Sequence, residues 1–250
     1  MYTCSISHTP LRAAAAHASE MVSMLLFGEE VTIIGEEGDY YWVENTFDQY
    51  RGYVPKAHIT QREEGALAFL KNDFLPIPFR QGAVLLPKGA MLVVDAQGSF
   101  FYQGHALRLP NEARLLMSHE AEFNSAELLQ SAYQFVGTPY LWGGRTRFGI
   151  DCSGFVQLLF KEQGIALKRD AKEQVVQGVA VASIQQAQLA DLAFFANKAG
   201  KVTHVGVMDG KGSIIHSSGQ VRVDSVDEKG IFNAELNEYT HELCAIRRLV

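Results

Sequence analysis

Cys152 lies in a stretch of this chain whose residues suit nucleophilic catalysis. It follows the glycine pair Gly143-Gly144 and precedes a run in which Val156, Leu159 and Phe160 recur at helical spacing. The pattern predicts a cysteine at a helix N-terminus, where the macrodipole and free N–H groups favour a thiolate. A thiolate is the nucleophile of acyl transfer, although an isolated cysteine is also often a small buried hydrophobic residue. The catalytic interpretation therefore needs a histidine brought close by the fold.

Two histidines flank a strong hairpin signal further along the chain. His204 and His216 lie in apolar runs that Asp209-Gly210-Lys211-Gly212 separates. A three-residue loop at 209–211 puts the two histidines directly opposite each other on one face, a few ångströms apart. A four-residue loop would shift the register by one and misalign them, so this prediction depends on the turn.

These residues suggest acyl transfer, with Cys152 as nucleophile, His204 as base and His216 as the group that orients the base. A histidine in third place lacks the negative charge of an aspartate, so its role would be chiefly geometric. The same three side chains could instead bind zinc. No carboxylate or second cysteine arrives with ligand spacing, so we expect neither a metal nor a cofactor. The remaining histidines that we considered carry no pattern, and we expect them at the surface: His8, His17 and His241.

Composition excludes several other functions. The chain has 250 residues and a net charge of -6, so no basic footprint for nucleic acid is evident. No apolar run approaches the ~18 residues of a membrane span. Three cysteines, far apart, argue against a disulfide framework. The N-terminus lacks a basic region followed by an apolar core, so we expect a cytoplasmic location, or the periplasm or exterior if a leader has been removed.

The chain divides into three predicted units, at residues 1–61, 62–119 and 120–250. The first two are expected to be small β modules, because β-branched and aromatic runs alternate with turn signals. Their predicted strands include 31–34, 40–44, 83–86, 91–95 and 100–102. Residues 12–24 are rich in Ala and Ser, and both a helix and a strand with a long loop stay open there.

The third unit is expected to be α+β, because helical patterns precede a run of strands. Asn124-Ser125-Ala126-Glu127 has capping-box spacing before an apolar helix that Gly137 ends. The helix of Cys152 follows it. The predicted strands are 192–195, 202–208, 213–216, 221–223 and 245–249.

Four motifs in this order closely resemble the NlpC-type family of cell-wall cysteine peptidases. They are Tyr140-x-Trp142-Gly143-Gly144, Asp151-Cys152-Ser153-Gly154-Phe155, His204-Val205-Gly206-Val207 and Ile215-His216-Ser217-Ser218. The resemblance covers about half the chain and implies a papain-like domain with a triad of Cys152, His204 and His216. It also implies that Tyr140 lies beside an oxyanion hole to which the Cys152 backbone N–H contributes. A phenol and a backbone N–H can stabilise a tetrahedral oxyanion, whereas Tyr140 could also simply pack against Trp142.

The N-terminal module resembles a bacterial SH3-like domain in Leu26-Phe27-Gly28-Glu29, Trp42 and the segment 48–54. We expect the second module to be of the same kind. Family members with such domains resemble γ-D-glutamyl-diamino acid endopeptidases. These cut peptidoglycan stem peptides of the form L-Ala-γ-D-Glu-diamino acid that begin with a free amine.

By this resemblance Asp151 and Tyr50 bind the substrate ammonium, with Ser153 and Glu29 as further candidates. A buried ammonium needs an ionised partner, and Asp151 would supply the charge. Asp151 could equally be a helix cap, and Tyr50 a core or surface aromatic residue. Arg169-Asp170-Ala171 also matches a family segment near the groove, without an assigned role.

Two rival functions stay open. The same scaffold could carry a hydrolase or acyltransferase that acts on intact cell wall or on a lipid. Alternatively, the β modules could hold wall peptides beside a non-catalytic third unit.

Overall fold

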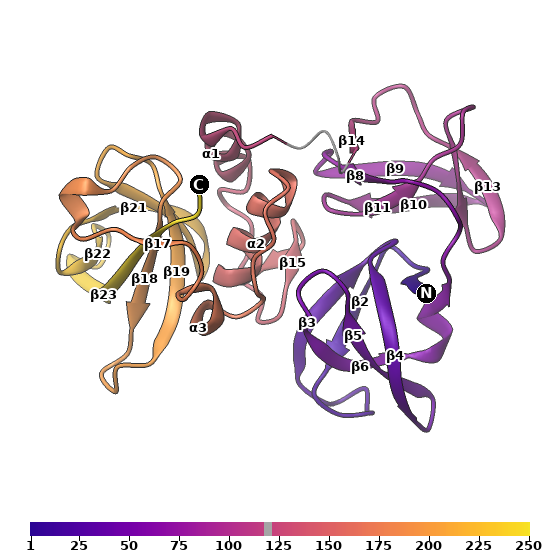
Figure 1. The fold of residues 1–250 in the computed structure, drawn as a ribbon, viewed down its shortest axis with the longest axis horizontal. Helices are drawn as coiled ribbons and strands as arrows, with labels where there is room; N and C mark the ends of the chain where they lie inside the picture. The colour runs from indigo at the N-terminus through magenta and orange to yellow at the C-terminus, as the bar shows by residue number, and fades with distance from the viewer. Residues whose placement is uncertain (118–121) are drawn as a thin grey trace. The chain divides into compact units, whose positions relative to one another are not determined.

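The computed structural model describes residues 1–117 and 122–250, which belong to two compact units, Met1–Ala121 and Glu122–Val250 (Figure 1). The predicted boundary between residues 119 and 120 lies outside the described residues. Within the described ranges, no helix is both long enough and apolar enough to cross a membrane.

The first module of the first unit is a seven-stranded sheet in the order β3-β2-β6-β5-β4-β1-β7. Apolar side chains that alternate along these strands form its core, among them Leu11, Leu25 and Val43. Residues 12–24 form strand and loop rather than a helix. The elements are β1 (Tyr2–Cys4), β2 (His8–Arg12), β3 (Met21–Leu26), β4 (Glu30–Glu37), β5 (Tyr40–Asn45), β6 (Arg51–Pro55), η1 (Lys56–His58) and β7 (Ile59–Gln61).

The second module consists of three small antiparallel sheets, pairing β9 with β10, β12 with β13, and β8 with both β11 and β14. The predicted strands at 83–86, 91–95 and 100–102 overlap β10, β11 and β12, and β11 is two residues shorter than predicted. That this module is SH3-like stays a prediction. The elements are β8 (Leu67–Leu70), β9 (Phe74–Phe79), β10 (Gly82–Pro87), β11 (Met91–Val93), β12 (Ser99–Tyr102), β13 (His105–Arg108) and β14 (Leu115–Met117).

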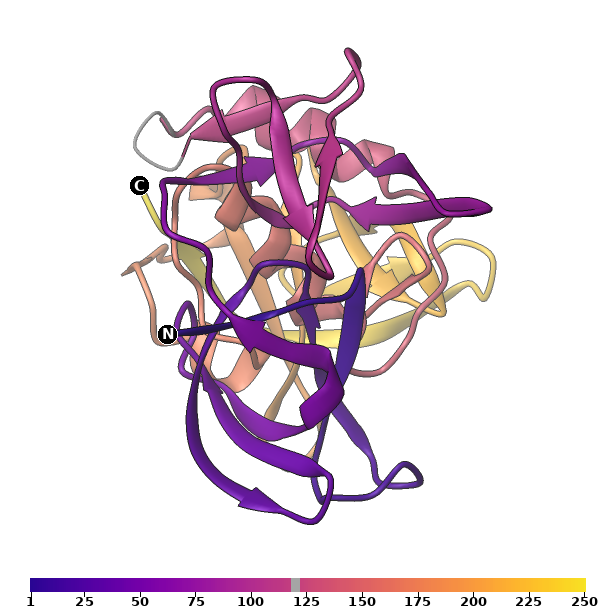
Figure 2. The same cartoon turned by 90° about the vertical axis from the view of Figure 1, so that its right-hand side faces the viewer.

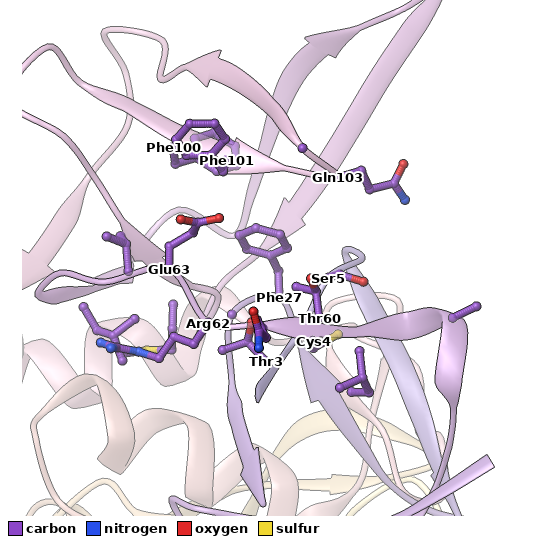
Figure 3. Close-up of a pocket in the computed structure, with 18 residues that line it drawn as sticks. Thr3, Cys4, Ser5, Phe27, Thr60, Arg62, Glu63, Phe100, Phe101 and Gln103 are labelled. Atoms are coloured by element: carbon purple, nitrogen blue, oxygen red, sulfur yellow. The ribbon is translucent and has the colours of Figure 1, made fainter. Parts of the chain in front are cut away.

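The two modules lie side by side within the first unit (Figures 1 and 2). A pocket of about 390 Å³ is lined by both of them (Figure 3). Phe27 contributes to its wall from the first module, and Phe100 and Phe101 contribute from the second. None of the eight residues predicted for the functional site lines this pocket.

The second unit contains three short helices and a sheet that closes on itself. The strand order is β17-β23-β18-β19-β20-β21-β22, and β22 also pairs with β23, so β18 to β23 form a six-stranded barrel. The elements are α1 (Ser125–Gln134), β15 (Arg145–Thr146), β16 (Gly149–Ile150), α2 (Cys152–Glu162), α3 (Ala171–Gln174), β17 (Val179–Ala180), η3 (Ile184–Gln186), β18 (Leu192–Ala196), β19 (Val202–Met208), β20 (Ser213–Ser218), β21 (Gln220–Val226), β22 (Gly230–Asn233) and β23 (Glu238–Arg248).

Helix α2 is the buried centre of this unit. Ten of its eleven residues are buried, and it packs against α1, β19 and β20. The side chain of Asn124 caps α1 by accepting from the N–H groups of Ala126 and Glu127, as the capping motif predicts. The backbone N–H of Asn124 donates to Gln163 just after α2, which ties the start of α1 to the end of α2.

The hairpin of β19 and β20 has a different register from the one predicted. Met208 pairs with Ile214 and Gly206 pairs with His216, so the direct pairing of His204 with His216 was wrong. Five residues, 209–213, separate the paired Met208 and Ile214, and within this turn the carboxylate of Asp209 accepts from the N–H groups of Lys211 and Ser213. A shift of two residues leaves every side chain on its face of the sheet. The two histidines are therefore diagonal neighbours on one face.

Candidate active site

Cys152 is the first residue of α2, as the sequence predicts, and Asp151 is its N-cap. The backbone N–H groups of Val205 and Ser153 lie close enough to the Cys152 sulfur to lower its pKa. Val205 follows His204 directly on β19, so the thiol is held against the strand that carries the proposed base. Figure 1 shows α2 and β19 side by side.

The thiol is not biased toward the thiolate. Burial raises the pKa of Cys152 to about 12, helped by the negative charge of Asp151. The two N–H groups and Arg169 lower the pKa but do not outweigh burial. The helix terminus therefore has a smaller effect than predicted, because the desolvation penalty of a thiolate at a buried helix end exceeds the stabilisation from these donors.

His204 and His216 form a direct contact, with 2.8 Å between His204 Nε2 and His216 Nδ1. Both rings are buried and nearly perpendicular, with an interplanar angle of 85°. Gly206 allows this geometry, since a Cβ there would lie 2.8 Å from the His216 Cβ. Burial and the neighbouring imidazoles hold the pKa of His204 well below its ordinary value, so His204 is a neutral ring able to accept a proton.

A carboxylate that sequence reasoning missed lies behind His216. His216 Nε2 is 2.9 Å from Asp224 Oδ2, and Arg222 donates to both oxygens of Asp224 at 2.6 and 2.9 Å. Burial alone would raise the pKa of Asp224, but the hydrogen bonds from His216 and Arg222 lower it to about 2. The signal in the sequence was the alternation Arg222-Val223-Asp224 on the strand after His216, which puts both polar side chains on the face of the histidines.

His241 was predicted to lie at the surface, and this was wrong. Its ring on β23 stacks on His204 with centroids 4.2 Å apart and an interplanar angle of 28°. Burial lowers the pKa of His241 to about 4. The closure of the barrel brings β23 next to β18. No local pattern in the sequence predicts that pairing. His17 is exposed and His8 is partly buried.

Tyr140 lies close enough to Cys152 for their charges to interact. Burial raises the pKa of Tyr140 to about 12, and the charges of Cys152 and Asp151 add to this. The phenol is therefore protonated at neutral pH and can donate a hydrogen bond. The backbone of Tyr140 is fixed by its N–H, which donates to Gly219, and by a bridge to Ile150 just before α2. The oxyanion role predicted for Tyr140 stays a prediction.

Asp151 is both a helix cap and one half of a buried ion pair. Its Oδ1 accepts from Gly154 N–H, Ser153 Oγ and Arg169 Nη1, and its Oδ2 accepts from Gly143 N–H and Arg169 Nη2. A carboxylate offers about four lone-pair sites, so the protein itself fills this one. Ser153 is held in the same network, since its Oγ also accepts from Arg169 at 3.0 Å. A substrate ammonium would have to share the carboxylate with these donors.

Tyr50 and Glu29 belong to the first unit. Glu29 is buried beneath the turn after β3, where it accepts from the Leu26 N–H at 3.0 Å. Tyr50 lies just before β6 and packs against the core of its own module. Their predicted part in the ammonium pocket stays a prediction. Across the described residues, no group of three or more His, Cys, Asp and Glu side chains is arranged to hold a metal ion.

Comparison with protein families finds two matches. Residues 137–238 match the NlpC/P60 family, and residues 11–59 match the bacterial dipeptidyl-peptidase SH3 domain. Cys152, His204, His216, Asp151 and Asp224 lie in the first of these segments, and His241 follows it.

Two curated relatives align over most of the chain. The chain is 29% identical over 245 residues to the gamma-D-glutamyl-L-lysine dipeptidyl-peptidase of Bacillus cereus, covering 80% of this chain and 68% of the relative. It is also 29% identical over 245 residues to the enzyme of the same name from Bacillus subtilis, covering 90% and 80%. A crystal structure of an NlpC/P60 family protein from Bacillus cereus superposes with a TM-score of 0.84 at 21% identity and covers 99% of both chains. That similarity extends the fold match to nearly the whole chain.

Proposed function

Residues 137–238 form an NlpC/P60 domain, and from this premise we propose that the protein is a cysteine peptidase of peptidoglycan stem peptides. The bond cleaved is the one between γ-D-glutamate and a diamino acid, in peptides with a free N-terminal L-Ala. The observation that carries the proposal is the 2.8 Å contact between the two imidazoles, one of which lies next to Val205, whose N–H lowers the pKa of Cys152.

The reaction begins from a neutral pair. The Cys152 sulfur attacks the γ-carbonyl carbon of D-glutamate while its proton passes to His204, because neither a thiolate nor an imidazolium is stable in this buried site beforehand. The Cys152 N–H and the Tyr140 phenol stabilise the oxyanion. His204 then gives its proton to the departing amine of the diamino acid. Water hydrolyses the acyl-enzyme by the same groups in reverse.

The substrate class is supported by the relatives' names. Both describe dipeptidyl-peptidases, which release a dipeptide from a free amino end, and both specify a γ-D-glutamyl bond. For this chain the corresponding product is L-Ala-γ-D-Glu. Recycling of released wall peptides is the process that such a requirement fits.

The test uses L-Ala-γ-D-Glu-diaminopimelate, its N-acetyl derivative and intact sacculi, with products identified by mass spectrometry. We expect cleavage of the free peptide, with a preference over the acetylated one of several orders of magnitude. Cys152→Ala should abolish turnover, and Cys244→Ala, a control on the exposed face of β23, should leave it unchanged. Retained turnover in Cys152→Ala would remove the assignment. Cleavage of sacculi in preference to the free peptide would favour the rival wall hydrolase.

A further inference from the structure

On the basis of the proposed function, we propose that Asp224 is a positioning residue that extends the relay to Cys152–His204–His216–Asp224. It acts through His216 and fixes which nitrogen of His204 receives the thiol proton. Its charge also compensates the imidazolium that forms on His204 during the reaction.

Asp224 is buried on β21, and Arg222 holds both of its oxygens, so it remains ionised throughout the neutral range. An ionised carboxylate can only accept hydrogen bonds. The 2.9 Å contact with His216 therefore requires a proton on His216 Nε2.

The protonation of His216 then fixes that of His204. A neutral imidazole with its proton on Nε2 has a lone pair on Nδ1. His216 Nδ1 is 2.8 Å from His204 Nε2, so His204 must donate there and carry its proton on Nε2. The lone pair of His204 is thereby placed on Nδ1. We assign His204 Nδ1 as the atom that takes the proton of Cys152.

The proton balance of this step is simple. The S–H bond of Cys152 breaks, its proton binds His204 Nδ1, and the sulfur electron pair forms the bond to the substrate carbonyl carbon. His204 becomes an imidazolium whose Nε2–H already points at His216. His216 and Asp224 keep their own protonation, and the negative charge of Asp224 lies one ring away from the new positive charge. This supplies the charge that a histidine in third place lacks.

Several charged groups surround this relay. Arg222 on β21 faces Asp224, His241 on β23 stacks on His204, Glu235 contacts Arg222 at 3.3 Å, and Cys152 on α2 faces β19. Arg222 neutralises part of the Asp224 charge, so the effect on His204 is smaller than that of an aspartate in direct contact. We therefore expect a loss of about 10- to 100-fold rather than the ~10⁴-fold of a directly paired base.

The primary test is kinetic. Asp224→Asn should lower kcat about 10- to 100-fold with KM changed less than about twofold, and it should move the acid limb of the kcat/KM profile to lower pH. The limb moves because loss of the anion makes His204 harder to protonate. Asp224→Glu should recover a large part of the rate. Asp209→Asn, in the turn of the same hairpin, is the matched control and should stay within about twofold of wild type.

An equal kcat in Asp224→Asn, or a loss in kcat without movement of the acid limb, would overturn the proposal. A second measurement does not depend on activity or on the folding of a variant. Nitrogen NMR of the ¹⁵N-histidine-labelled wild type should show His204 and His216 both protonated on Nε2 at neutral pH. A His204 protonated on Nδ1 would contradict the relay even if Cys152→Ala abolishes turnover. A wild type without peptidase activity would remove the proposed function and leave the NMR result to decide the relay.

Discussion

Two buried aspartates flank the thiol and the imidazoles, and each is held by an arginine, yet the two pairs differ in what else they bind. Asp151 receives five protein donors, three of them from backbone N–H groups or Ser153, and its partner Arg169 has a side chain only 1% exposed. Asp224 receives donors from Arg222 and one imidazole, and the Arg222 side chain is 20% exposed. The first pair holds backbone N–H groups, and the second holds the imidazole that contacts the proposed base.

This difference separates two tasks that one aspartate could not perform together. The Asp151–Arg169 pair ties the start of α2 to the glycine-rich segment before it, and a position with every lone pair engaged has no freedom to respond to chemistry. Asp224 has fewer hydrogen-bond donors around it, and in the proposed relay its charge compensates the imidazolium on His204. A site that needs a rigid nucleophile and a responsive base thus assigns each carboxylate to one of them.

The largest expected difference between the two pairs is the loss in the free energy of unfolding when the arginine is replaced. Arg169→Gln leaves Asp151 buried without its cation, and breaking a buried pair in this way costs about 3–5 kcal/mol. Arg222→Gln removes a partly solvated cation, and we expect a cost of about 1 kcal/mol or less. Urea unfolding of the second unit can be followed by Trp142 fluorescence in a Trp42→Phe background, because these are the two tryptophans of the chain. Equal losses in the two variants would erase the distinction between the pairs.

The site residues that the sequence predicts are those with local signals. Cys152, Asp151 and the two histidines were found because their signals are local: a helix pattern, a cap and a hairpin turn. The histidine register was wrong by two residues, and the prediction of proximity survived because such a shift preserves the face. A one-residue error would have separated the rings.

Two contacts that the sequence did not predict come from closure of the fold. Arg169 contacts Asp151 from 18 residues away in the sequence, and His241 contacts His204 because β18 pairs with both β19 and β23. No spacing rule predicts either contact. The thiol pKa was misjudged for a related reason. Burial is a property of the assembled barrel and helices, whereas the helix terminus is visible in the sequence.

A smaller expected effect concerns the reactivity of the Cys152 thiol, which lies between the Asp151 and Asp224 networks. Asp151 raises and Arg169 lowers the pKa of Cys152, and burial sets it at about 12. At pH far below that value the thiolate fraction grows tenfold per pH unit, so iodoacetamide alkylation of Cys152 should rise about 100-fold from pH 7 to pH 9 without a plateau. Peptide mass spectrometry can measure this, with buried Cys4, whose pKa is also raised to about 12, as an internal reference. A plateau beginning below pH 7 would mean a preformed thiolate–imidazolium pair.

The smallest expected effect is a change in selectivity between two substrates, and it tests whether Asp151 binds the substrate amine. Asn is as good a helix N-cap as Asp, so Asp151→Asn keeps the bond to the Gly154 N–H and removes the charge that pairs with Arg169. Because that charge serves the protein's own network, we expect the losses on L-Ala-γ-D-Glu-diaminopimelate and on its N-acetyl form to agree within about threefold. The ratio of the two kcat/KM values, each relative to wild type, is the quantity to measure.

Tyr50→Phe supplies the matched comparison, because it removes one hydroxyl from a residue predicted to contact the ammonium and leaves the Asp151–Arg169 pair intact. A loss confined to the free-amine peptide in Tyr50→Phe, together with an equal loss on both peptides in Asp151→Asn, would assign amine selection to the SH3-like module. The opposite outcome, a selective loss in Asp151→Asn, would mean that a substrate ammonium does join the donors around this carboxylate. In that case Asp151 would combine the two tasks that the comparison with Asp224 separates.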